Sequence, residues 1–120
     1  MDFRKKAGRL GETAAASFLE SQGVRILLRN FYCRQGEIDL IAKEGEVFLA
    51  VEVKWRRNKK QGQPCEAVDL RKQRKICRAY DYFRLKYDLD EYVPARFDVV
   101  EVDGDYQCRW IKNAFEYHWP

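Results

Sequence analysis

Two short segments of the sequence carry charged side chains in strands that are otherwise apolar. Asp39 lies within residues 36–42, and Glu52 and Lys54 lie within residues 51–54. Carboxylate oxygens are ligands that Mg²⁺ prefers, and bound Mg²⁺ lowers the pKa of a water and neutralises a phosphodiester under attack. A nearby lysine could orient that water or stabilise developing negative charge. The residue types therefore predict metal-dependent phosphodiester hydrolysis.

The two segments come together if the chain between them forms a tight hairpin. With residues 44–45 (Glu-Gly) as a two-residue loop, Asp39 stands opposite Ala50 and diagonal to Glu52. Because side chains alternate between the faces of a strand, Asp39, Glu52 and Lys54 then share one face. A four-residue loop would preserve this arrangement, whereas a three-residue loop would reverse it.

Surface ion pairs offer an alternative explanation of the same pattern, because Glu and Lys one residue apart are common on strands. Asp39, Glu52 and Lys54 interrupt apolar strands, however, where charges are costly unless they are paired or functional. Structural ion pairs can also mimic functional ones. The two explanations differ in whether Mg²⁺ binding stabilises the protein, so both stay open at the level of sequence.

The composition places these segments in a small globular protein. The chain has 120 residues, which suits one domain (1–120) with one hydrophobic core. It is 46% hydrophobic and 14% aromatic, which argues against disorder. No apolar stretch has the length of a membrane span, and the first residues lead into no signal-peptide core. We therefore expect no membrane partner and a cytoplasmic location.

The cysteines and the single histidine exclude several other kinds of site. Cys33, Cys65, Cys77 and Cys108 show no CxxC spacing, and His118 lies close to the C-terminus. This pattern argues against a disulfide framework and against a zinc site. It also excludes a histidine-based metallohydrolase and a Ser-His triad, so the cysteines are interpreted as packing residues.

A net charge of +4 conceals two basic clusters. The first comprises Lys54, Arg56, Arg57, Lys59 and Lys60, and the second comprises Arg71, Lys72, Arg74, Lys75 and Arg78. The acidic residues gather elsewhere, at 88–91 and 101–105. A basic face without a strongly basic protein suits binding to a phosphate backbone. A solvated loop and a solvated helix face are the alternatives for the two clusters.

The remaining pattern predicts the elements that position these charges. Residues 4–22 have helical periodicity, with Leu10, Ala14, Phe18 and Leu19 on one face. Strands are expected at 24–33, 37–43, 46–55, 96–102 and 106–112, with a hairpin turn at 103–104 before the last of them. The order α-βββ-α-ββ predicts an α/β fold, a mixed five-stranded sheet flanked by helices.

A second helix is expected from Pro64, a residue favoured in the first turn, to about Tyr87. Its buried stripe consists of Val68, Ile76, Ala79, Tyr80 and Phe83. Lys72 lies on the same stripe, where a lysine either extends its ammonium to an edge or points into a site. The sequence leaves both alternatives open.

Several motifs resemble the YraN family of small bacterial proteins. They are Gly8-Arg9 to Glu12, Arg29-Asn30, Gly36-Glu37-Ile38-Asp39-Leu40-Ile41-Ala42, Val51-Glu52-Val53-Lys54, Arg96-Phe97-Asp98-Val99-Val100 and Asn113-Ala114-Phe115. That family is similar to archaeal Holliday-junction resolvases and belongs with the PD-(D/E)xK, restriction-endonuclease-like nucleases. The resemblance implies a restriction-endonuclease-like sheet and a phosphodiesterase site that uses Mg²⁺ or Mn²⁺.

The resemblance also implies roles for individual residues. Asp39 and Glu52 match the metal-binding acids, and Lys54 matches the lysine of the motif. The backbone carbonyl of Val53 is implied as a further metal ligand. Glu12 matches an acid that resolvase-like members place on the first helix as an extra ligand.

Two further positions complete the comparison of motifs. Lys72 or Gln73 matches a polar position on the helix after ExK that often joins such sites. Ile38 stands where the name of the motif has proline, a departure that is familiar in the superfamily.

The function expected from the sequence is that of a Mg²⁺- or Mn²⁺-dependent DNA endonuclease, with branched or structured DNA as one candidate substrate. Residues expected to contact nucleic acid are Arg56, Arg57, Lys59, Lys60, Lys72 and Gln73. The alternative is a nucleic-acid-binding or partner-recruiting domain that keeps the fold without efficient catalysis. The C-terminal aromatics fit either a homodimer interface or closure of the core; they are Trp110, Phe115, Tyr117 and Trp119.

Overall fold

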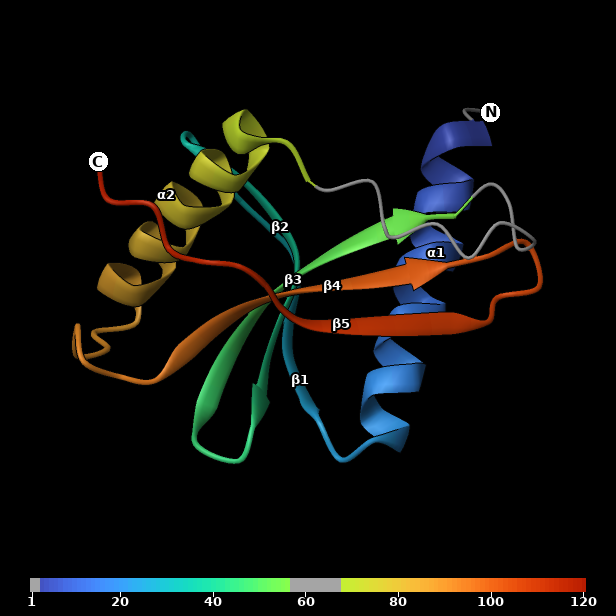
Figure 1. The fold of residues 1–120 in the computed structure, drawn as a ribbon, viewed down its shortest axis with the longest axis horizontal. Coiled ribbons are helices and arrows are strands. Elements are labelled where there is room, and N and C mark those ends of the chain that lie inside the picture. Colours follow the sequence, from blue (N-terminus) through green and yellow to red (C-terminus); the bar gives the residue numbers. More distant parts are fainter. Residues whose placement is uncertain (1–2, 57–67) are drawn as a thin grey trace.

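The computed structural model describes residues 3–56 and 68–120. The elements are α1 (Phe3–Ser21), β1 (Arg25–Cys33), β2 (Gly36–Glu44), β3 (Val47–Trp55), α2 (Leu70–Lys86), β4 (Ala95–Val102) and β5 (Cys108–Phe115). The strands form one sheet in the order β1-β2-β3-β4-β5, with β3 and β4 parallel and the other neighbours antiparallel. The helices cover opposite faces of this sheet (Figure 1), which confirms the predicted α/β architecture.

Each helix covers its own hydrophobic core. On one face Ala15, Ala16 and Leu19 of α1 pack in the same core as Leu49 of β3. Leu10 was predicted to lie on the buried face of α1, but this prediction is wrong, because its side chain is 43% exposed. The small residues bring α1 close to the sheet, as burying apolar area against a flat surface requires. Neither helix in the described part of the chain is long and apolar enough to cross a membrane.

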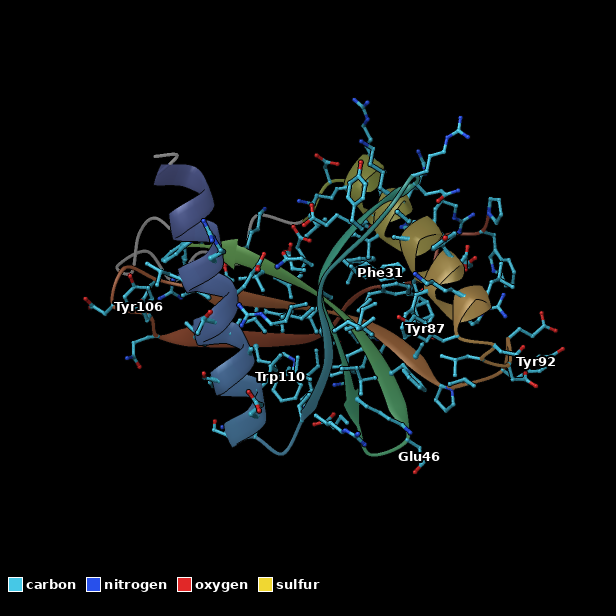
Figure 2. The ribbon with its side chains drawn as sticks, turned by 180° about the vertical axis from the view of Figure 1, so that it is seen from behind. Phe31, Glu46, Tyr87, Tyr92, Tyr106 and Trp110 are labelled. Carbon is cyan, nitrogen blue, oxygen red and sulfur yellow. The ribbon has the colours of Figure 1, made fainter. Side chains whose placement is uncertain are left out.

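Helix α2 covers the other face with a stripe that matches the prediction. Ile76, Ala79, Tyr80 and Phe83 are buried, and Val68 is buried just before the helix. Figure 2 shows Phe31 beneath α2 and Trp110 on the side of α1. The sheet thus supports one apolar core on each face.

Helix α2 begins later than predicted. The predicted start at Pro64, which itself lies outside the described residues, is wrong because the helix begins at Leu70. Asp69 has an extended backbone, and its carboxylate accepts a hydrogen bond from the backbone N–H of Lys72 at 2.8 Å. An aspartate in this position satisfies a free amide of the first turn and fixes the start of the helix.

The loop between β2 and β3 lies one residue later than predicted. Glu44 pairs with Val47, so Gly45 and Glu46 form the two-residue loop. Gly45 has a φ of +57°. A common type of two-residue hairpin loop takes glycine with positive φ at its first position, which explains the shift.

The register of the hairpin changes accordingly. The predicted pairing of Asp39 with Ala50 is wrong, because Ala50 pairs with Ile41 and Leu40 pairs with Val51. The offset amounts to two positions along the strand. An even offset keeps the face of every side chain, so the prediction that odd positions of β2 share a face with even positions of β3 holds along the paired part.

The connection from β4 to β5 is longer than the two-residue turn predicted at residues 103–104. Strand β5 begins at Cys108, two residues later than predicted, and ends three residues later. The Asp103 carboxylate accepts hydrogen bonds from the backbone amides of Asp105 at 2.8 Å and Gln107 at 3.0 Å. Aspartate side chains that bind nearby amides in this way stabilise longer loops.

The C-terminal aromatics mostly pack against the protein. Phe115 is buried and stacks on Phe97 with ring centroids 5.1 Å apart, and Trp110 meets Phe18 edge-on. Tyr117 also packs on Phe97, whereas Trp119 is 85% exposed. These contacts support closure of the core for three of the four rings.

Three of the cysteines lie in the described part of the chain and are free thiols. Cys33 and Cys77 are buried, and Cys108 is half-buried. Their packing matches the interpretation from the sequence. Cys65 lies outside the described residues.

Candidate active site

Strand β2 changes its pairing at Asp39. Its ladder with β3 ends at the pair formed by Leu40 and Val51, although both strands continue beyond it. Ile38 and Ile41 lie in the same core although an odd number of positions separates them, so the alternation of faces breaks between them. Asp39 therefore lies at a local break in the sheet.

The Asp39 side chain replaces a backbone partner at this break. Its Oδ2 accepts a hydrogen bond from the backbone N–H of Val53 at 2.8 Å, a bond that a regular ladder would give to a main-chain carbonyl. The Asp39 carboxyl group is also hydrogen-bonded to the Glu52 side chain. Two strands that diverge are thus held together by a side chain, and two carboxyl groups meet in the opening.

The surroundings of Asp39 raise its pKa to about 8. Burial is the largest cause, the charge of Glu52 is the next, and the charge of Glu12 adds to both. The hydrogen bond from Val53 opposes the shift. The protonated form of Asp39 is therefore favoured, as expected when two like charges lie this close.

Glu52 receives its countercharge from α2. Its side chain is only 6% exposed, and its Oε1 lies 2.6 Å from the Nζ of Lys72. Burial lowers the pKa of Lys72, but the hydrogen bond and the negative charge of Glu52 outweigh it, so the pKa is raised. Of the two alternatives for Lys72, the structure shows the second, with the ammonium pointing into the site.

The carboxyl pair opens onto a cleft of about 530 Å³ between β2 and α2. Its lining consists of Tyr32, Gly36, Glu37, Asp39, Glu52, Asp69, Arg71, Lys72, Lys75 and Ile76. A Cβ on Gly36 would lie 3.0 Å from the backbone oxygen of Lys75, so the glycine allows β2 and α2 to approach closely here. Acidic groups from the sheet and basic groups from the helix therefore face one cleft.

Glu12 comes from the opposite side of the sheet, because α1 packs on the other face. It is half-buried, and its Oε2 is a buried atom without a hydrogen-bond partner among the described residues. Glu12 lines a separate hollow of about 270 Å³ together with Asn30. Asn30 adopts a φ of +53° in β1, next to the pairs that bracket Asp39. The hollow that Glu12 and Asn30 line thus adjoins the break in the sheet at Asp39.

The other residues predicted for the site take different places. Lys54 follows Glu52 on β3 and is half-buried, but it does not line the cleft among the described residues. Gln73 donates to the backbone oxygen of Val68 at 2.6 Å, and its Oε1 lies 2.6 Å from Nε2 of His118. Gln73 is thus held by protein groups, whereas Lys72 faces the cleft.

The first basic cluster is only partly described. Nη2 of Arg56 lies 4.0 Å from Oδ2 of Asp103, and its backbone N–H donates to Val102. Arg57, Lys59 and Lys60 lie outside the described residues. In the second cluster, Arg71, Lys72 and Lys75 line the cleft.

Several residues of the cleft were not predicted as site residues. Arg71 and Lys75 were known only as part of a basic cluster, and Asp69 was obscured by the predicted start of the helix. Tyr32 is the aromatic residue that precedes the first turn of the sheet by two positions. This position near a strand end is the only signal for it in the sequence.

The donor groups fit a hard divalent cation, since carboxylate oxygens are what Mg²⁺ and Mn²⁺ prefer. The orphaned Oε2 of Glu12 and the raised pKa of Asp39 both indicate acidic groups that lack positive charge. Among the described residues no group of three or more Asp, Glu, His or Cys side chains has metal-holding geometry. Among the described residues, Asp39 and Glu52 are therefore the pair of carboxyl groups that could hold a cation. Mg²⁺ in such a site keeps several waters as further ligands.

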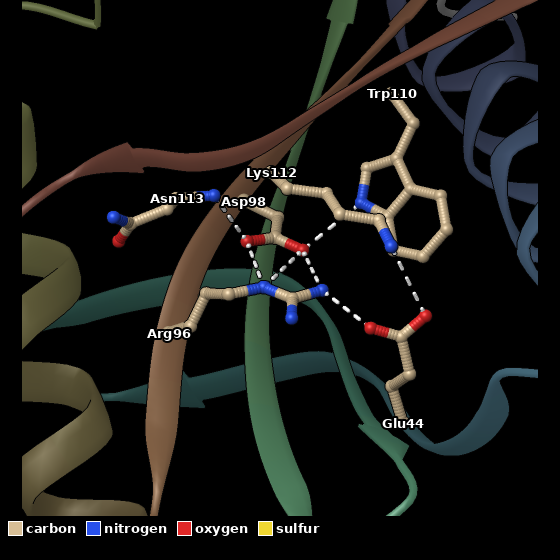
Figure 3. Close-up of polar contacts among 6 residues, drawn as sticks. All are labelled: Glu44, Arg96, Asp98, Trp110, Lys112 and Asn113. Atoms are coloured by element: carbon tan, nitrogen blue, oxygen red, sulfur yellow. Dashed lines mark hydrogen bonds and ion pairs between the residues drawn. The ribbon is translucent and has the colours of Figure 1, made fainter.

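A buried network stabilises the sheet on the α1 side. Asp98 is fully buried, and its oxygens accept hydrogen bonds from Nε of Arg96 at 2.9 Å and Nε1 of Trp110 at 2.9 Å. The backbone N–H of Asn113 donates to it at 2.8 Å. Arg96 also contacts Glu44 at 2.9 Å (Figure 3). Each partner is satisfied, so this second charged cluster is structural.

Comparison with known proteins identifies a family that the chain matches. The model of a family described as "Uncharacterised protein family UPF0102" matches residues 11–102. A UPF0102 protein of Symbiobacterium thermophilum is 48% identical over 115 residues, covering 92% of this chain and 97% of its own length. Relatives from Lachnoclostridium phytofermentans and Neisseria gonorrhoeae are 45% and 42% identical over 113 residues, each covering 94% of this chain and 95% and 97% of their own. The matched span contains Glu12 and the whole lining of the cleft.

Proposed function

The chain belongs to the UPF0102 family, which is the YraN family that its motifs resemble, and we propose that it is a metal-dependent DNA endonuclease. The observation that carries the proposal is the close pair of carboxyl groups of Asp39 and Glu52 in a cleft that basic residues border. A pKa raised by burial and a like charge, in a cleft, is typical of functional sites.

The proposed metal ligands are Asp39 and Glu52, with the carbonyl of Val53 and the Glu12 carboxylate as further members. A bound Mg²⁺ or Mn²⁺ would supply an activated water and positive charge at the phosphate. Asp39 has to release its proton when it becomes a ligand. The hydrogen bond from Val53 already orients one oxygen of Asp39.

The remaining charged groups suit a polyanionic substrate. Lys54 is proposed to assist the attacking water, because it follows Glu52 by two positions on the same strand. Arg71 and Lys75 border the cleft and would contact phosphates on either side of the reacting bond. Lys72 orients the Glu52 side chain and offsets its charge. The cleft thus combines acids for a cation with bases for a backbone.

The proposal is tested by incubating the purified protein with branched, single-stranded and duplex DNA in Mg²⁺ or Mn²⁺. Asp39→Asn and Glu52→Gln should each slow cleavage by at least about 100-fold, since loss of an outer-shell partner alone costs about 10- to 100-fold. Glu46→Gln is the matched control, because Glu46 lies in the exposed loop of the same hairpin. Cleavage that survives both site substitutions would come from a contaminant and would refute the proposal.

A non-catalytic nucleic-acid-binding domain is the second candidate. The ion pair between Lys72 and Glu52 favours it, because the protein's own cation neutralises one of the two acids. This candidate predicts salt-sensitive binding of DNA without turnover in either metal. Binding that is lost on neutralising Arg71 and Lys75, with no cleavage of any substrate, would favour it over the endonuclease.

A further inference from the structure

Tyr32 is an exposed aromatic residue at the mouth of the cleft. It lies near the end of β1, and its side chain is 78% exposed. It lines the same cleft as Asp39 and Glu52. Its strand partner is Glu37, which also lines the cleft. A phenol ring in this position is accessible to a ligand that enters the cleft.

Most other exposed tyrosines of the described chain use their rings in contacts with the protein. Tyr82 packs on Phe31, Tyr87 on Phe83, and Tyr106 on Trp55. These contacts explain why the rings remain at the surface. Their burial is partial, but each ring has an aromatic partner.

Tyr32 and Tyr92 differ from these residues. Among the described residues neither ring contacts another aromatic ring, and Tyr92 is 85% exposed. Tyr92 projects from the loop after α2, at the edge of the molecule (Figure 2), and does not line the cleft. Tyr32 is thus the free ring that borders the candidate active site, and Tyr92 is a free ring that does not.

Two exposed cations line the same cleft as Tyr32. Arg71 and Lys75 line it from α2, and both side chains are exposed. Cations that contact a backbone together with an aromatic ring that contacts a base form the usual arrangement for binding single strands. Bases in a continuous duplex are already stacked on each other, so their faces are not available to a side chain unless a nucleotide is extruded.

We propose that Tyr32 stacks on an unpaired nucleobase beside the carboxyl pair, so that this cleft selects single-stranded or unpaired DNA over continuous duplex. The inference rests on the proposed function, because it names the substrate class of the same site. It goes beyond that function by assigning specificity to a residue outside the acids and lysines. Arg71 and Lys75 would hold the phosphates of the same strand.

The experiment measures DNA binding by fluorescence anisotropy in EDTA, where metal-dependent cleavage does not occur. The probes are a labelled thymidine oligonucleotide and a labelled duplex of the same length. Tyr32→Ala should weaken binding of the single strand by about 5- to 150-fold, the range that loss of one stacked base produces. Binding of the duplex should change by less than about 2-fold, since its bases do not reach the ring.

Two further variants make the result specific. Tyr32→Phe keeps the aromatic face and should retain the wild-type preference. Tyr92→Ala removes the other free ring and should leave both affinities unchanged. Thermal melts of all three variants check folding. Replacement of Tyr32, which is 78% exposed, should not change the stability of the fold. Equal losses for single strand and duplex in Tyr32→Ala, or no loss for either, would overturn the inference.

This experiment separates the inference from the endonuclease proposal. Binding in EDTA reports on Tyr32 without any catalytic step. Tyr32-dependent preference for single strands, with no cleavage in Mg²⁺ or Mn²⁺, would retain the inference and refute the endonuclease. Cleavage that depends on Asp39, with no effect of Tyr32→Ala on binding, would retain the endonuclease and refute the inference.

Discussion

At the scale of single residues, the pKa of Asp39 reflects the electrostatics of the cleft. Burial and the charge of Glu52 raise its pKa from an ordinary 3.8 to about 8. A group whose pKa is higher in the folded state binds more protons folded than unfolded between those two values. Its contribution to stability is therefore complete below the unfolded pKa and is lost as the pH rises through the folded one.

The pH dependence of stability should follow from this shift. In EDTA, the free energy of unfolding of the wild type relative to Asp39→Asn should decrease as the pH rises from about 4 to about 8. Urea denaturation at a series of pH values measures it, and the variant serves as the reference for all other titrating groups. Saturating Mg²⁺ should remove the decrease, because a bound cation favours ionised Asp39. A difference between the two proteins that is independent of pH would contradict the assignment.

Replacement of Lys72 should show whether the buried Glu52 side chain requires a positive charge beside it. Lys72→Met leaves the buried Glu52 without its partner, which should lower the unfolding free energy by about 1–3 kcal/mol, since half of the Lys72 side chain is in solvent. Mg²⁺ should then raise the melting temperature of this variant more than that of the wild type. Lys75→Met, in the same cleft, is the control. Identical behaviour of the two variants would show that the ion pair contributes nothing.

At the scale of elements, the site is produced by the interruption of β2. A continuous ladder would pair the backbone of β2 with that of β3 and leave no opening for two carboxyl groups. The break at Asp39 frees the amide of Val53, which the Asp39 side chain then binds. Gly36 at the start of β2 allows α2 to lie close enough for Lys72 to contact Glu52. Two local features of β2, the break at Asp39 and the glycine at position 36, thus allow the three elements to meet.

Gly36→Ala tests the contact between β2 and α2. Its Cβ would lie 3.0 Å from the Lys75 backbone oxygen, and a helix backbone cannot move as a side chain end can. Overpacking of this kind costs about 1–3 kcal/mol, and DNA cleavage should fall with it because Lys72 would be displaced. Gly8→Ala is the control, since a Cβ there meets nothing within 4 Å and alanine favours the helix. Calorimetric melting of both variants gives the comparison, and equal stability would contradict the close approach.

At the scale of the whole molecule, two apolar cores and one buried network stabilise the sheet from both faces. Asp98 joins β4 to β5 through Trp110 and Asn113, and Arg96 extends the network to the end of β2 at Glu44. The network itself offers no candidate chemistry, because its described groups are paired with one another. The network therefore stabilises the frame, whereas the less satisfied acids face the cleft.

Asp98→Ala should destabilise the protein strongly. It leaves the guanidinium of Arg96 and the indole N–H of Trp110 without their buried partner, and breaking a buried charged pair costs about 3–5 kcal/mol. Urea denaturation should show this loss, while Glu46→Ala, at an exposed ion pair of 4.0 Å, should stay within about 0.5 kcal/mol. A loss for Asp98→Ala as small as that of the control would show that the network is dispensable.

The amino-acid sequence by itself predicted the order of elements and the residues of the carboxyl pair. Hydrophobic periodicity identified the strands and helices, because burial of apolar side chains has the same period as the element. The charges of Asp39 and Glu52 stood out because they interrupt apolar strands. Element ends were predicted less well: Gly45 and the Asp69 cap each shifted a boundary, since a single turn residue decides where pairing begins.

Only the tertiary structure decided how the site is assembled. The break that frees Val53, the contact of Lys72 with Glu52, and the place of Tyr32 at the cleft all involve residues from different elements. Sequence periodicity describes one element at a time, whereas the pKa of Asp39 depends on burial and on the charges of Glu52 in β3 and Glu12 in α1. The sequence thus determined which groups could do chemistry, and the packing of β2, β3 and α2 decided which of them meet.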